Sequence, residues 1–319
     1  MRQEWEQVLA EIEKVIAGKR AVIEKILMAL LAEGHVLMDD VPGVGKTTLA
    51  VAISRAIGLE YRRVQFTPDV LPSDLVGFSL YDKDSGDFLF RPGVVSQVNL
   101  LLGDEINRAS SKTQSALLEA MEEKQVSVDG NTYPLQKPFL VIATENSVGA
   151  AGTQLLPFAQ MDRFLVRLSL GYPDYEAQMA LLRARQGSQP MDQVQTVLSK
   201  DRLCQMQREA QQVTAKEEIL DYITRLTLAS HDQEELELGI SPRGALFLDR
   251  AAKAKAYLAG RDYVTGTDVR EVFLDVCTHR VLLTEQARRE GKSVEGVLRE
   301  LLKKVETPDH HGLTGWKKR

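Results

Sequence analysis

One short stretch constrains the fold more than any other part of the chain. An apolar segment at residues 35–38 leads into a glycine-rich loop, and helical spacing follows from Leu49. Strand, loop and helix in this order are typical of a loop that binds nucleotide phosphates: glycines let backbone N–H groups surround the oxygens, a lysine reaches the β and γ phosphates, and a threonine hydroxyl can ligate Mg²⁺. The predicted nucleotide-binding residues are Pro42, Gly43, Val44, Gly45, Lys46, Thr47 and Thr48, and Thr47 is also a predicted magnesium ligand.

The loop departs from the usual pattern at its first position. A glycine normally stands five residues before the Gly-Lys pair, but this chain has Asp40 there. The loop therefore matches G-x-x-x-x-G-K-[ST] only in its last three fixed positions. An ordinary turn rich in glycine and proline, with an exposed lysine, is the alternative interpretation.

Length and charge limit the classes of protein that remain. A chain of 319 residues with 44% hydrophobic composition can bury a large core and form one large domain plus a smaller one. Its 40 basic and 45 acidic residues leave a formal charge of −5, which gives no general attraction to nucleic acid. The first residues are charged where a secretory signal would be apolar, and no run approaches the ~18 apolar residues that a spanning helix needs. We expect a soluble, cytoplasmic protein.

The cysteines and histidines do not form a recognisable metal or disulfide pattern. Cys204 and Cys277 stand apart in helical segments, without a Cys-x-x-Cys spacing. The five histidines are isolated or lie in the polar C-terminal segment. We therefore expect buried free thiols and no zinc site.

Strand and helix signals alternate through the first half of the chain. The spacing predicts two helices within residues 2–34, strands at 35–38, 61–66, 99–102 and 139–143, and a helix at 112–123. Strands that alternate with helices predict an α/β fold in which helices flank a parallel sheet. Because the strand signals stop after residue 172, we place the nucleotide-binding core at 1–172, a smaller helical domain at 173–306 and a flexible tail at 307–319.

Paired carboxylates follow a second apolar strand. Asp104 and Glu105 follow residues 99–102 after a single glycine, about where a phosphate site needs them opposite its loop. Asp104 is a predicted magnesium ligand, and Glu105 is the predicted base that orients and deprotonates the attacking water. The alternative is an acidic surface turn after a buried strand.

A third polar group follows the strand at 139–143. That strand brings Asn146 to the carboxyl edge of the sheet, where ligands of open α/β sheets bind. Asn146 could position the water or contact the γ phosphate. Its alternative role is to cap the end of the strand.

Taken together, these residues resemble the MoxR family of AAA+ ATPases. The resemblance runs from about Ile16 to Leu302. Its most specific stretches are Asp104-Glu105-Ile106-Asn107-Arg108-Ala109, residues 112–123, residues 156–164 and Ser241-Pro242-Arg243.

The resemblance implies a magnesium-dependent ATPase that assembles as a ring, most simply a hexamer. It implies an α/β core with a helical lid, an insertion in the second helical region at 67–93, and a hairpin at 125–135 before the sensor-one strand. Lys46 and Thr47 map to Walker A, Asp104 and Glu105 to Walker B, Asn146 to sensor one, Arg163 to the arginine finger and Arg243 to sensor two. Gly18 maps to the segment that contacts adenine, although a glycine at a helix boundary would explain it equally well.

The two mapped arginines should act in different subunits. Arg243 opens a helix after a Ser-Pro start signal, so it can fold over its own nucleotide, whereas Arg163 would serve a neighbour. Phe158 stands where relatives carry an acidic residue, which bears on the geometry beside Arg163. Arg108 is therefore a second candidate for the finger.

The function that we expect is ATP-driven remodelling or maturation of client proteins, typically with a partner that has a von Willebrand factor A domain. A motor or loader that acts on nucleic acid is the alternative, and a nucleotide-gated scaffold with little turnover is another. The acidic net charge argues against the motor, and Glu105 with Asn146 argues against the scaffold.

Overall fold

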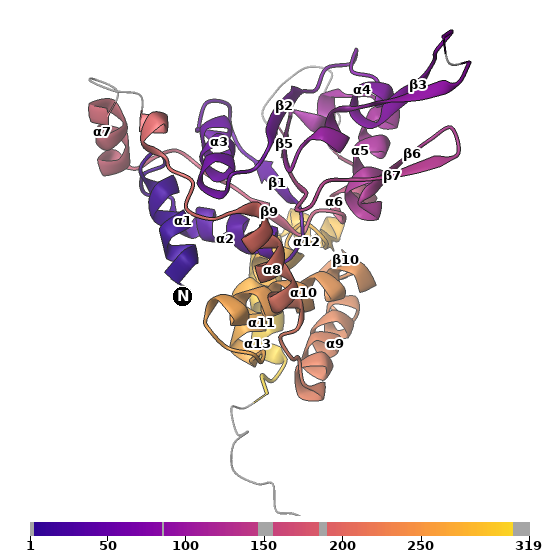
Figure 1. The fold of residues 1–319 in the computed structure, drawn as a ribbon. Helices are drawn as coiled ribbons and strands as arrows, with labels where there is room; N and C mark the ends of the chain where they lie inside the picture. The colour runs from indigo at the N-terminus through magenta and orange to yellow at the C-terminus, as the bar shows by residue number, and fades with distance from the viewer. Residues whose placement is uncertain (1–2, 85, 146–155, 185–189, 309–319) are drawn as a thin grey trace, which may run out of the picture. The chain divides into compact units, whose positions relative to one another are not determined.

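The computed structural model describes residues 3–84, 86–145, 156–184 and 190–308. The chain forms two compact units, Met1–Arg208 and Glu209–Arg319 (Figure 1). Among the helices of the described ranges, none combines the length and the hydrophobicity that a membrane span requires.

The first unit is built on a parallel sheet, as the sequence predicts, but the sheet has five strands and not the four that we expected. The strands lie in the order β2 (Tyr61–Gln65), β5 (Leu100–Asp104), β8 (Leu140–Glu145), β1 (Val36–Asp39) and β9 (Val166–Leu168). Every neighbouring pair is parallel. The carboxyl ends of these strands therefore converge on one edge, where the polar residues that follow β1, β5 and β8 meet.

Helices cover both faces of this sheet. On one face Leu37, Leu101 and Val141 pack in a buried cluster with residues of α5 (Ser111–Glu123). Side chains alternate along a strand, so Val36, Leu100 and Leu102, all fully buried, face the other side. Helix α3 (Lys46–Ile57) contacts β2 and β5 there, and α1 (Gln3–Glu13) packs on both α3 and α2 (Arg20–Leu31). Burial on both faces explains why the inner strands β1, β5 and β8 read as apolar runs.

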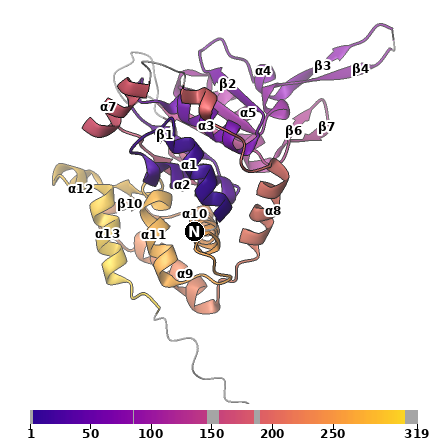
Figure 2. The ribbon, with the colours of Figure 1, turned by 60° about the vertical axis from the view of Figure 1, so that its left-hand side comes forward.

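Two hairpins extend from the same end of the first unit. Residues 67–93 form α4 (Pro72–Val76) and the hairpin of β3 (Gly77–Tyr81) and β4 (Phe88–Pro92), followed by the short helix η1 (Val94–Gln97). The second hairpin consists of β6 (Gln125–Val128) and β7 (Asn131–Pro134). Figures 1 and 2 show the two hairpins side by side, and the Phe90 ring stacks on the Tyr133 ring with centroids 3.8 Å apart.

The second unit is mainly helical, but the prediction of helices alone was incomplete. Its helices are α9 (Glu217–His231), α10 (Pro242–Leu258), α11 (Gly266–Cys277), α12 (Glu285–Arg289) and α13 (Val294–Lys304). A small antiparallel ladder joins β10 (Leu236–Leu238) to β11 (Leu282–Leu283). Strands of two and three residues are too short to produce a readable alternation, so they could not be predicted from the sequence.

The units do not divide at residue 172, where the strand signals stop. The division lies within α8 (Lys200–Gln211), because the chain after β9 returns to the first unit. Arg202 donates two hydrogen bonds to Glu4 (2.8 and 2.9 Å), and Gln207 donates to the Leu30 carbonyl (2.7 Å).

The remaining elements of the first unit are η2 (Ile106–Arg108), α6 (Phe158–Met161), α7 (Tyr175–Ala184) and η3 (Pro190–Gln193). Of the tail predicted at 307–319, residues 309–319 lie outside the described residues.

The thiols are free, as expected, but they differ in exposure. Cys277 is buried, and burial raises the pKa of its thiol to about 12. Cys204 is partly exposed, so the expectation that both thiols are buried was wrong for this one.

A buried carboxylate stabilises the start of α11. Asp268 is 3% exposed and accepts hydrogen bonds from Arg261 and from the backbone and hydroxyl of Thr265. Burial alone would raise the pKa of Asp268, but the hydrogen bonds from Arg261 and Thr265 outweigh burial and hold that pKa below its usual range. The carboxylate therefore stabilises the fold above about pH 4, and this contribution is lost as the pH falls through the lowered pKa.

We predict that Asp268→Asn destabilises the protein by about 1–3 kcal/mol at pH 7, because Arg261 loses its charged partner. The destabilisation should shrink as the pH falls below about 4. Urea unfolding between pH 3 and 7 measures both effects. Asp262→Asn removes the same charge from an exposed neighbouring residue and should change little. Equal stability losses in the two variants would contradict this role for Asp268.

Candidate functional site

The glycine-rich loop joins β1 to α3 and needs glycine at two positions. Gly43 and Gly45 have φ values of +85° and +102°, in the region that side chains other than glycine rarely adopt. Gly45 caps α3, which begins at Lys46. A helix start with exposed N–H groups and a positive dipole end attracts anions.

Asp40 anchors the first position of the loop. Its carboxylate is buried and accepts hydrogen bonds from the Ser169 hydroxyl (2.8 Å) and from the backbone N–H groups of Leu170 (2.6 Å) and Gly171 (2.9 Å). Lys46 donates to the Asp40 carbonyl (3.2 Å). The aspartate thus has a positional role that glycine could not fill, which accounts for the departure from the usual pattern.

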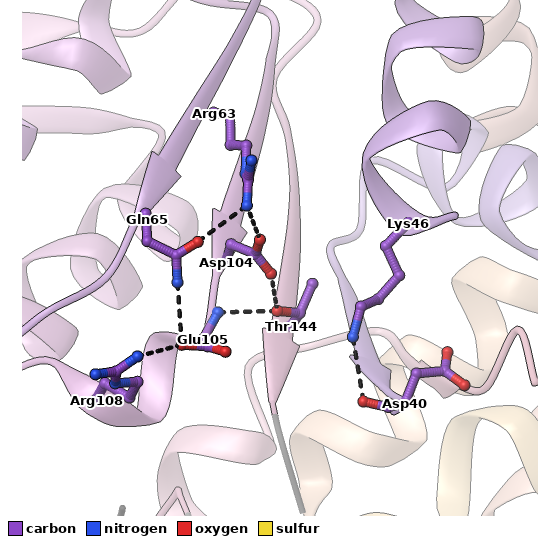
Figure 3. Close-up of polar contacts among 8 residues, drawn as sticks. All are labelled: Asp40, Lys46, Arg63, Gln65, Asp104, Glu105, Arg108 and Thr144. Carbon is purple, nitrogen blue, oxygen red and sulfur yellow. Dashed lines mark hydrogen bonds and ion pairs between the residues drawn. The ribbon is translucent and has the colours of Figure 1, made fainter. Parts of the chain in front are cut away.

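The paired carboxylates end β5 in a constrained geometry. Glu105 has φ +56°, a left-handed conformation that costs energy for a residue with a side chain. Its N–H donates to the Thr144 hydroxyl (2.8 Å), and that hydroxyl donates to Oδ1 of Asp104 (2.6 Å). A single buried threonine therefore holds both carboxylate residues in position (Figure 3).

Cationic and amide groups surround the same carboxylates. Arg63 donates to Oδ2 of Asp104 (2.6 Å), and Gln65 donates to Oε2 of Glu105 (3.0 Å). Arg108 also donates to Oε2 of Glu105 (2.7 Å). Figure 3 shows Arg63 and Gln65 on β2 pointing toward the end of β5.

The loop and the carboxylates line one cavity of about 380 Å³. Its walls are Pro42, Gly43, Gly45, Lys46, Thr47, Thr48, Arg63, Gln65, Asp104 and Glu105. This set fits a magnesium nucleotide: a lysine and a helix start suit phosphate oxygens, and a threonine hydroxyl with a carboxylate suits a hard divalent cation. A larger cavity of about 900 Å³ in the second unit has no phosphate loop, so its size does not identify a site.

Other predicted site residues lie outside this wall. Val44 belongs to the loop but is not among the described lining residues. A Cβ added to Gly18 would lie 3.1 Å from the Cβ of Ala177. The neighbouring Lys19 donates a hydrogen bond to the Tyr172 carbonyl (2.7 Å). The Ile16 side chain lies 3.6 Å from the position that a Cβ added to Gly45 would occupy. This N-terminal segment therefore contacts the phosphate loop.

The predicted arginines belong to different units. Arg163 lies between α6 and β9, donates to Glu122 on α5 (2.9 Å) and to the Ala159 carbonyl (3.0 Å), and is not among the residues described in the cavity wall. Arg243 lies in the first turn of α10 in the second unit, where Ser241 caps the helix by accepting from Gly244 N–H (3.0 Å). Asn146 lies outside the described residues.

Sequence reasoning missed three members of the site: Arg63, Gln65 and Thr144. The first two are polar residues two positions apart on a predicted strand, a spacing that places them on one face. Their partners depend on β2 pairing with β5, where Gln65 lies opposite Asp104. No local pattern in the sequence specifies that pairing.

A glutamate at the end of β8 lies next to the site. Glu145 is buried, and burial raises the pKa of its carboxyl, although the hydrogen bond from the Leu156 N–H (2.9 Å) and the charge of Arg167 oppose that effect. The side chain therefore connects the end of β8 to Leu156, two residues before α6 and within the segment that leads to Arg163.

Comparisons with known proteins agree with this geometry. Residues 35–166 match the model of the ATPase family associated with various cellular activities (AAA), and residues 228–301 match the AAA lid domain. The YeaC protein of Bacillus subtilis is 43% identical over 302 residues, which cover 95% of this chain and 94% of YeaC. The chaperone MoxR1 of Mycobacterium tuberculosis is 39% identical, with 95% of this chain and 82% of MoxR1 covered.

A crystal structure of a protein from Cytophaga hutchinsonii has the same fold. Its TM-score is 0.87 at 37% identity, and the match covers 96% of this chain and 95% of that one. The parallel sheet, the phosphate loop, the paired carboxylates and the full-length relatives lead to one assignment. The chain belongs to the MoxR family of AAA ATPases.

Proposed function

We propose that this ATPase hydrolyses ATP in the 380 Å³ cavity, with the phosphate loop as the binding element and Glu105 as the base. The observation that carries the proposal is that Lys46 and Glu105 line the same cavity, although about 60 residues separate them in sequence. Backbone N–H groups of residues 43–48 and Lys46 would hold the phosphates. Glu105 would accept a proton from the attacking water.

Thr47 and Asp104 would hold Mg²⁺, which when bound neutralises phosphate charge. Both residues line the cavity, one at the start of α3 and the other at the end of β5. Asn146 would orient the water and Arg243 would contact the nucleotide of its own chain. Gly18 would lie at the adenine, and contact between its segment and the phosphate loop supports that role.

We further propose that the active form is a ring, most simply a hexamer, in which Arg163 completes the site of a neighbouring subunit. The ion pairs of the two arginines favour Arg163 over Arg108. Arg108 is paired with the proposed base Glu105 of its own chain (2.7 Å), whereas Arg163 is paired with Glu122 (2.9 Å), which is not among the residues described in the cavity wall. An arginine supplied by an adjoining subunit can stabilise the charge of the phosphoryl-transfer transition state, which is worth about 10³–10⁵ in rate.

The two hairpins would act on a client protein. The β3–β4 hairpin exposes apolar side chains that a free surface rarely carries together: Phe78, Leu80, Tyr81, Phe88 and Leu89 are 43–72% exposed. Leu80 and Leu89 lie directly opposite each other across the hairpin. We propose that this apolar surface binds unfolded or partly folded segments, and that a protein with a von Willebrand factor A domain supplies the client.

An ATPase assay with three additions tests the proposed function. Phosphate release should require Mg²⁺ and should respond to an unfolded protein such as casein. It should not respond to DNA, because the acidic chain offers no general attraction to it. Salt-sensitive stimulation by DNA without any response to casein would favour a nucleic-acid motor instead.

We predict that Leu80→Ser with Leu89→Ser lowers the affinity for fluorescent casein by about tenfold, because two leucine side chains that casein would bury on binding are lost. Basal ATPase activity should stay within about threefold of wild type, since neither residue lines the cavity described above. The matched control is Leu220→Ser with Leu228→Ser, which removes two exposed leucines from α9. Collapse of basal hydrolysis in the hairpin variant would place the hairpin in the catalytic core.

A further inference from the structure

The two oxygens of Asp104 have partners of different kinds. Oδ1 accepts from the Thr144 hydroxyl and Oδ2 accepts from Arg63, each at 2.6 Å (Figure 3). Thr144 is 1% exposed, whereas the Arg63 side chain is 46% exposed. A cation that approaches Asp104 from the cavity therefore meets one fixed partner and one that can move.

The Thr144 partner is fixed by its surroundings. The residue lies on β8, in the interior of the sheet between β5 and β1. Its hydroxyl has a single proton, which it donates to Asp104 while it accepts the N–H of Glu105 (2.8 Å). Release of Oδ1 would leave a buried hydroxyl unsatisfied and would loosen Glu105 as well, which makes this contact costly to break.

The Arg63 partner is held loosely. It lies on β2 at the edge of the sheet, and besides Asp104 it donates to Oε1 of Gln65 (3.0 Å). Exposed ion pairs are weak because water screens them and the long side chain loses freedom when it is held. Movement of this guanidinium toward solvent therefore costs little.

We propose that Arg63 competes with the magnesium ion for Oδ2 of Asp104 and so sets the magnesium concentration that the site requires. The inference rests on the proposed role of Asp104 as a metal ligand. A guanidinium and a divalent cation at one carboxylate oxygen repel each other, so the cation gains its ligand only as Arg63 leaves. Thr144 keeps the carboxylate aligned during the exchange.

The test uses the full chain and mant-ADP, whose affinity is titrated by fluorescence across a range of magnesium concentrations. The measured quantity is the magnesium concentration at which half of the gain in mant-ADP affinity is reached. Arg63→Ala should lower this concentration by about three- to tenfold, because the competing charge is gone. Arg63→Lys keeps the charge and should return the value toward wild type.

Arg62→Ala is the matched control. It removes the same charge from the adjacent residue of β2, whose side chain points to the opposite face of the sheet. Its half-point should stay within about twofold of wild type, since only a general electrostatic effect remains. An equal fall of the half-point magnesium concentration in Arg63→Ala and Arg62→Ala would overturn the proposal that Arg63 competes with magnesium.

Two further outcomes separate this inference from the proposed function. If Asp104→Asn abolishes the magnesium effect but Arg63→Ala leaves the half-point unchanged, the competition is wrong and the metal-ligand role stands. If Asp104→Asn retains the full magnesium effect, the metal-ligand role itself fails. Loss of mant-ADP binding by Arg63→Ala in EDTA would show that Arg63 binds nucleotide and would also overturn the inference.

Discussion

Glu105→Gln should bind ATP as the wild type does but release phosphate more slowly by a factor on the order of 10² or more. The amide keeps the size and an acceptor oxygen for Gln65 and Arg108, so the local structure should persist. It cannot accept the proton of the attacking water. Lys46→Ala should instead lose ATP binding, because the lysine supplies the positive charge at the start of α3.

Nucleotide affinity and single-turnover phosphate release, measured on both variants, separate the two roles. Gln65→Ala is a useful control, since it removes one hydrogen bond to Glu105 without removing the base. It should reduce turnover much less than Glu105→Gln does. Equal loss of ATP binding in the Lys46 and Glu105 variants would show that the two residues do not have separate functions.

Mixtures of two inactive variants should recover activity if each site is shared between subunits. A Lys46→Ala subunit cannot bind ATP but still presents Arg163 to the adjacent subunit. An Arg163→Ala subunit binds ATP but cannot complete the active site of the adjacent subunit. Each variant alone should be inactive, because loss of an arginine finger costs about 10³–10⁵ in rate. In a mixed ring, some boundaries pair an intact loop with an intact arginine, and these should turn over.

Arg108→Ala is the control in the same experiment. Arg108 pairs with Glu105 of its own chain, so Lys46→Ala mixed with Arg108→Ala should give no recovery beyond the residual activity of the Arg108 variant. Recovery with Arg108→Ala and none with Arg163→Ala would move the finger to Arg108. Because Arg163 also pairs with Glu122 (2.9 Å), Glu122→Gln shows what loss of that ion pair alone does to folding and assembly.

The core of the site was predictable because local chemistry determines it. Gly43 and Gly45 have the positive φ values that the loop pattern requires, and the helix starts within the loop at Lys46, just before Leu49, from which the sequence shows helical spacing. The carboxylates meet the loop because parallel strands bring their carboxyl ends to one edge. For Asp104 and Glu105, a strand followed by polar residues is enough to predict that they lie at the edge of the sheet beside the loop.

The contacts around that core were not predictable, because they join residues far apart in the chain. Asp40 bonds to residues about 130 positions later, and Arg63 reaches Asp104 only because β2 and β5 are neighbours. Strand order is a property of the whole sheet, and no periodicity in one segment encodes it. The same limit explains why the boundary between the units, which lies within α8, was predicted at the wrong place. The helical spacing of α8 is the same whichever unit the helix packs against.

The rate of phosphate release per subunit, measured against protein concentration, tests most directly whether the active site is shared. If Arg163 completes a neighbour's site, the specific rate should rise with concentration in parallel with a species several times the 35.6 kDa monomer, and ATP should promote that species. Sedimentation of Glu105→Gln with and without ATP gives the mass under conditions of slow turnover. A specific rate that stays constant down to concentrations at which only the 35.6 kDa monomer sediments would contradict the shared site.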